Sequence, residues 1–200
     1  MNTTSPSELS ESKLQQKIIL SLILFATLTR IAIPPFLGAH LPNFSPIDAI
    51  ALFCGAYFHR RLTAFSVGLL SVWIGDLFIN KILMGHWTLF YEGFYWQYGS
   101  YLLITWLGTT LARQVNPLRL MTTCFAAAVL FFIVSNFGVW CSGMLYPFNF
   151  DGLIACYIAA IPFFKNTLFS DLFFSILLFG SFQWIRIKIY TKKSLQQSIL

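Results

Sequence analysis

Charged side chains are scarce in this chain of 200 residues: only 10% are Asp, Glu, Lys or Arg, whereas 57% are hydrophobic. A soluble domain has about a quarter of its residues charged, so the composition excludes a water-soluble globular protein. The formal net charge of +6 would suggest nucleic-acid binding in a soluble chain, but the 13 cations are too scattered to follow a phosphate backbone. Because one bilayer crossing needs roughly 20 apolar residues, the chain has room for about six or seven crossings and no sizeable domain outside the membrane.

Recognisable catalytic and metal-binding motifs are also missing. The four cysteines lack C-x-x-C spacing, and the three histidines stand in three different connections between apolar segments. No H-E-x-x-H, G-x-S-x-G or G-x-x-x-x-G-K-[ST] pattern occurs. We therefore expect no catalytic residue, no bound metal and no cofactor, and any ATP-driven step would need another subunit. Cys141 and Cys156 both fall near the predicted outer face, where they could form a disulfide or serve as apolar filling.

Long apolar segments predict an all-α membrane protein with about six transmembrane helices. The predicted crossings cover residues 18–37, 46–60, 63–84, 97–113, 119–141 and 164–187. Pro162 separates the last crossing from a short helix at 152–161, re-entrant or interfacial, because proline removes a helix hydrogen bond and disfavours helical geometry in the residue before it. Residues 1–17 then form a cytoplasmic polar tail, 18–187 a single transmembrane domain, and 188–200 a cytoplasmic basic tail.

Basic residues fall in alternate connections between these segments. Ten of the 13 cations follow this pattern: Lys13, Lys17, Arg60, Arg61, Arg113, Arg119, Arg186, Lys188, Lys192 and Lys193. Since loops rich in Lys and Arg remain in the cytoplasm, the pattern predicts that both termini are cytoplasmic. The segment 46–60 is short for a crossing, and we count it because the alternation of charge requires it.

Polar and ionisable residues inside the predicted crossings are functional candidates, because burying them in lipid is costly. The candidate substrate-binding residues are Arg30, Asn43, Asp48, Asp76, Asn80, Asn136, Lys165, Asn166 and Asp171. At a rise of about 1.5 Å per residue, several of them lie roughly 18–25 Å from the cytoplasmic ends of their helices, in the outer half of a core about 30 Å thick. The inner halves hold hydroxyls and one thiol but no charge. The sequence therefore predicts a polar cup, open to the outside, above an apolar plug.

Charge within this predicted cup does not balance. Three carboxylates, Asp48, Asp76 and Asp171, stand against one arginine, Arg30. One interpretation is a structural ion pair between Arg30 and an aspartate. The other is a negative surplus that attracts a cationic or metal-containing ligand, unless Lys165 or a proton balances it. A polar vitamin would suit the mixture of Asn, Asp and aromatic residues.

Aromatic residues gather in the connection HWTLFYEGFYWQY, residues 86–98, which the topology places outside. The candidates for an aromatic lid over the cup are Trp87, Tyr91, Tyr95, Trp96 and Trp140. Stacking or cation binding by such a lid is one interpretation. The other is the aromatic belt that membrane proteins place at the level of the lipid headgroups.

Four runs of sequence resemble a family of small bacterial membrane proteins of unknown function that are described as transport proteins. These runs are NFSPIDAIALFCGAYF (43–58), GD (75–76), SNFGVW (135–140) and GLIACYIAAIPFFKNTLFSDLFFSILLFG (152–180). That family is in turn similar to the substrate-binding S components of energy-coupling factor (ECF) transporters. The resemblance implies an S-component-like bundle with an external pocket capped by loops, in the bacterial cytoplasmic (inner) membrane. It also implies a separate membrane coupling subunit with ATPases as partner.

These observations favour a multi-pass protein that captures a small solute from outside and helps to import it, as an S-type subunit or a solitary transporter. The solute would be vitamin-like or a metal-containing micronutrient, and the other expected partner is the lipid bilayer. One rival is a membrane enzyme that acts on a lipid-linked substrate with Asp76, Asp171 and a histidine. Another is an assembly subunit that binds no ligand.

Overall fold

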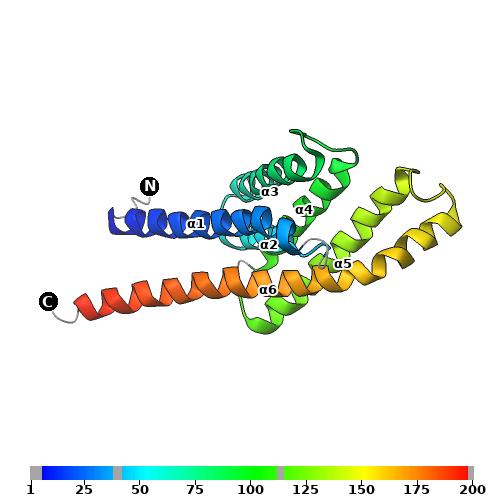
Figure 1. The fold of residues 1–200 in the computed structure, drawn as a ribbon. Helices are drawn as coiled ribbons and strands as arrows, with labels where there is room; N and C mark the ends of the chain where they lie inside the picture. Colours follow the sequence, from blue (N-terminus) through cyan, green and yellow to red (C-terminus); the bar gives the residue numbers. More distant parts are fainter. Residues whose placement is uncertain (1–5, 38–41, 112–114, 198–200) are drawn as a thin grey trace.

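The computed structural model describes residues 6–37, 42–111 and 115–197, and within these ranges the chain forms helices and turns without strands (Figure 1). The helices are α1 (Pro6–Leu37), α2 (Ile47–Tyr57), α3 (Arg61–Met84), α4 (Phe94–Gly108), the 3-10 turn η1 (Thr109–Leu111), α5 (Pro117–Cys141) and α6 (Phe150–Gln197). Four of these helices, α1, α3, α5 and α6, are long and apolar enough to cross a membrane. The chain is therefore an all-α membrane protein, as its composition predicts.

The second predicted crossing is wrong in length. Instead of a helix over 46–60, the structure has α2, with 11 residues, which spans only about 16 Å at 1.5 Å per residue. That is half of a hydrocarbon core about 30 Å thick. All residues from Ile47 to Ala56 are buried, so α2 is surrounded by other helices instead of lipid. Charge alternation alone could not reveal this half-length, enclosed helix.

Pro162 does not divide the last apolar stretch. It lies inside α6, one helix of 48 residues, so the separate short helix predicted at 152–161 is wrong. Proline removes only one backbone hydrogen bond, and packing on α5 holds the turns before it: the Tyr157 hydroxyl donates to the Ile133 carbonyl at 2.7 Å. Figure 1 shows α6 changing direction between its yellow and orange parts, as helices with an internal proline commonly do.

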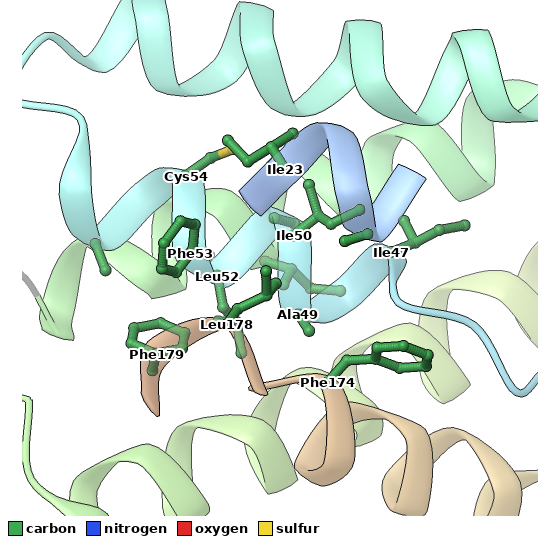
Figure 2. Close-up of a cluster of buried hydrophobic side chains, with 14 of the residues drawn as sticks. Ile23, Ile47, Ala49, Ile50, Leu52, Phe53, Cys54, Phe174, Leu178 and Phe179 are labelled. Carbon is green, nitrogen blue, oxygen red and sulfur yellow. The ribbon is translucent and has the colours of Figure 1, made fainter. Parts of the chain in front are cut away.

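Helix α2 lies at the centre of the apolar core (Figure 2). Ile50 and Phe53 pack among buried side chains of α1 and α6, and the Phe53 and Phe179 ring centroids are 5.2 Å apart. On another side α2 touches α4 backbone to backbone: a Cβ on Gly55 would lie 2.0 Å from the Thr105 carbonyl oxygen. Only glycine fits there, and such small residues let membrane helices approach closely.

Both ends of the described chain lie at the same end of the molecule. Figure 1 shows α1 beginning and α6 ending on the same side of the molecule, away from the connection between α5 and α6. Helices α2 and α6 run in the same direction, since Phe44 before α2 meets Phe174 while Tyr57 at its end meets Phe182. Asp48 in the first turn of α2 therefore lies at the same level as Asp171.

Candidate functional site

Two adjoining cavities open among the helices at this level. The first has a volume of about 160 Å³ and the second about 170 Å³. Asn43, Gln97, Phe131 and Thr167 line both. The first is also lined by Arg30, Ser45, Ile47, Asp48, Tyr101, Ser170 and Asp171, and the second by Phe132, Ser135, Asn136, Val139, Ala160, Phe163 and Phe164. The structure thus brings five of the nine candidate residues, Arg30, Asn43, Asp48, Asn136 and Asp171, to the walls of one connected polar site.

Arg30 is fixed at one wall of the first cavity by a hydrogen-bonded ion pair with Asp76. Its second terminal nitrogen donates to the Ser45 hydroxyl at 3.0 Å, and Tyr98 donates to the other oxygen of Asp76 at 2.8 Å. The arginine side chain lies across Gly75, where an added Cβ would be 2.7 Å from its Cδ. The structural ion pair, one of the two interpretations of the charges, is therefore present. Tyr98, which donates to Asp76 of this pair, belongs to the aromatic run 86–98, and nothing in the sequence distinguished it from the other aromatic residues there.

The two remaining aspartates form a carboxyl pair. Asp48 and Asp171 are both buried, both line the first cavity, and lie next to each other. An ionised carboxylate only accepts hydrogen bonds, so two adjacent buried carboxylates repel each other unless a proton or a cation lies between them. Oδ2 of Asp171 is enclosed and has no hydrogen-bond partner. An enclosed acceptor without a donor is costly, and a donor supplied by a ligand would remove that cost.

The other candidates support the cavity walls or lie away from them. Asn166 donates to the Pro42 carbonyl at 2.9 Å and so ties α6 to the segment before α2. Asn136 lines the second cavity and donates to the Phe132 carbonyl at 2.7 Å. Asn80 donates to the Thr88 carbonyl at 3.3 Å, one turn beyond Asp76. Lys165 is exposed and belongs to neither set of lining residues, so it does not balance the carboxylates inside the site.

The five lid candidates are not among the described residues that line the cavities. Trp87 and Tyr95 are 57% and 61% exposed, and the Trp140 indole donates to the carbonyls of the connection before α6. Trp96 packs against Gly138 of α5. Tyr91 alone reaches the site, because its hydroxyl donates to Gln97; burial raises the pKa of this phenol, which keeps the donor protonated.

The aromatic rings at the cavities come from inside the helices instead: Tyr101, Phe131, Phe132, Phe163 and Phe164. Sequence reasoning missed them, because a phenylalanine in an apolar helical run is usually core. Within the described ranges no three His, Cys, Asp or Glu residues cluster as metal ligands. Cys141 and Cys156 are free thiols, and Cys156 lies against the Asn136 carbonyl at 3.4 Å.

The fold and this site define a helical membrane protein with a polar cavity enclosed by its helices. Residues 10–195 match a family of unknown function, DUF6580, and the chain belongs to that family. Comparison with curated proteins and with solved structures finds no match.

Proposed function

We propose that this protein captures a small polar solute from the external side of a bacterial inner membrane and helps to import it. The observation that carries the proposal is the pair of adjoining cavities, whose walls combine ionisable, amide, hydroxyl and aromatic groups. Binding sites for small molecules are concave and mostly apolar, with a few convergent polar groups. Intramembrane ionisable residues that face such a cavity favour a ligand site over a purely structural role.

The inner half of the molecule supports capture over open conduction. Beyond the carboxyl pair, α2 and α6 close on each other through the rings of Phe53, Tyr57, Phe179 and Phe182. Tyr57 and Phe182 have ring centroids 4.3 Å apart, which leaves no room for a solute between them. Passage would therefore require a movement of the helices or of a partner.

Orientation follows from charge. The described chain begins and ends at one end of the molecule (Figure 1), and the cations Lys13, Lys17, Arg186 and Lys188 lie toward that end of α1 and α6. The positive-inside rule assigns this end to the cytoplasm, so the cavities lie in the outer half. This is the arrangement that the resemblance to ECF S components implies, and a separate coupling subunit with ATPases would be the partner; a solitary transporter would need none.

The size of the site limits the solute. Typical small-molecule pockets have volumes of about 300–1,000 Å³, and each cavity here is smaller, about 160 Å³ and 170 Å³. The pair together reaches only the lower end of that range. We therefore favour a small solute that occupies both cavities over a large vitamin.

Mass spectrometry of small molecules that co-purify with the protein in mild detergent tests this function. Thr167 is buried and lines both cavities, so Thr167→Met should fill the site and abolish enrichment of the solute. Thr122→Met, at an exposed position of α5, is the matched control and should retain it. Equal small-molecule content in the unaltered protein and both variants would contradict the proposal. So would deletion of the gene, if it impaired lipid turnover and left uptake of the solute unchanged.

A further inference from the structure

The charges that face the first cavity leave one negative charge in excess. Arg30 is the one cation among the described lining residues, and its ion pair with Asp76 occupies it. Asp48 and Asp171 lie next to each other on the wall of this cavity. Two adjacent buried carboxylates do not both ionise readily, so one shared proton would leave one ionised carboxylate. A monocation would neutralise the site, whereas a dication would have to displace the shared proton.

Asp171 also offers a free acceptor for such a cation. The side chain is 1% exposed, lines the first cavity, and has Oδ2 without a hydrogen-bond partner. Buried polar groups are almost always satisfied, so this unpartnered oxygen indicates a donor that belongs to a ligand. A protonated amine has N–H donors and the required charge, and hydrogen bonds between two ionised groups are the strong ones.

The second cavity offers space for an apolar body next to that amine. Phe131 and Phe132 on α5 and Phe163 and Phe164 on α6 line it, with Asn43 and Gln97 at the boundary with the first cavity. Phenyl faces attract cations and pack against flat apolar groups. Among the described residues no three His, Cys, Asp or Glu side chains cluster as metal ligands, and it is the phenyl wall beside the carboxyl pair that favours an organic cation.

We infer that the solute is a small organic monocation, whose protonated amine binds the Asp48–Asp171 pair while its apolar part lies among the four phenylalanines of the second cavity. This inference rests on the proposed capture function and narrows its substrate class. It makes Asp171 a specificity-determining residue and leaves the Arg30–Asp76 pair a structural role beside it.

Calorimetric titration of the full chain in detergent at neutral pH tests the inference with four probes: benzylammonium, benzyl alcohol, benzoate and Mg²⁺. Benzylammonium should bind at least about tenfold more tightly than benzyl alcohol, since one charge-assisted hydrogen bond is worth about that factor or more. Benzoate and Mg²⁺ should not bind at the site. Asp171→Asn should weaken benzylammonium about ten- to a hundredfold, and Asp48→Asn should weaken it similarly.

Asp151→Asn is the matched control, because Asp151 is exposed at the start of the same helix; it should leave the affinity unchanged. The comparison among the four probes uses the unaltered protein, so it holds even if a variant fails to fold. Binding of benzyl alcohol, benzoate or Mg²⁺ as tight as that of benzylammonium, or no binding of benzylammonium, overturns the inference. If the solute that co-purifies with the unaltered protein is neutral or anionic, and is absent from Thr167→Met protein, the inference is overturned while the capture function is supported.

Discussion

Helices α2 and α6 run in the same direction through two unlike regions. In one region, called the outer region after the proposed orientation, Asp48 of α2 lies beside Asp171 of α6 at a cavity. In the inner region Phe53 meets Phe179, with ring centroids 5.2 Å apart and ring planes at 90°. Among the described residues, polar contact between the two helices returns at the end of α2, where Gln183 donates to the Tyr57 hydroxyl at 3.2 Å.

The difference separates two tasks along the same pair of helices. Close-packed rings fill the inner region and hold the helices together by dispersion, because lipid tails are as apolar as the side chains and supply no hydrophobic driving force. The outer region instead keeps cavities and an unpartnered carboxylate oxygen, which reduces stability and leaves binding groups free. Changes in the inner region should therefore affect stability alone, changes in the carboxyl pair of the outer region should affect binding, and changes in the neighbouring Arg30–Asp76 ion pair should affect stability.

Asp76→Asn should have the largest effect, because it leaves the buried Arg30 guanidinium without its ion-pair partner. Removing one member of a buried pair costs about 3–5 kcal/mol of unfolding free energy. Denaturant titration of the protein in detergent measures it. Asp151→Asn, at an exposed site, is the control and should leave the free energy of unfolding unchanged. The double variant Asp76→Asn with Arg30→Gln should recover part of the lost stability. If it does not, the ion pair does not stabilise the bundle.

Phe53→Ala should lower the free energy of unfolding somewhat less than Asp76→Asn, and it should distinguish the two regions. Phe53 is fully buried in the inner region, and truncation of such a ring leaves a cavity worth about 3 kcal/mol. Solute content measured by mass spectrometry should nevertheless remain that of the unaltered protein. Phe169→Ala, at a side chain that is 63% exposed, provides the control; loss of the solute from folded Phe53→Ala protein would show that the regions are not independent.

Trp87→Ala should have the smallest effect. The indole is 57% exposed and lies away from both cavities, and substitutions at such positions usually change stability by less than about 0.5 kcal/mol. The affinity for benzylammonium should change less than twofold, as an interfacial belt requires. A tenfold loss of affinity in Trp87→Ala would instead support the aromatic lid. Trp96→Ala is the comparison variant, because Trp96 packs on Gly138.

The sequence predicted the helical class and the membrane character, because both follow from local properties of the chain. Burial cost identifies Asp76 and Asp171 as unusual, and a constant helical rise assigns them a common height. The length of α2 and the continuity of α6 through Pro162 were predicted wrongly. Both depend on neighbouring helices: burial on all sides lets α2 be short, and packing on α5 keeps α6 helical before the proline.

By itself, therefore, the sequence determined that this chain lies in a membrane and that its charge is divided between basic ends and a few intramembrane acids. Only the tertiary structure decided which acid serves which purpose. Asp76 is paired with Arg30, whereas Asp48 and Asp171 are paired with each other at a cavity. The physical reason is that helix spacing fixes a side chain's height and face, while its partner is chosen by how separate helices pack together.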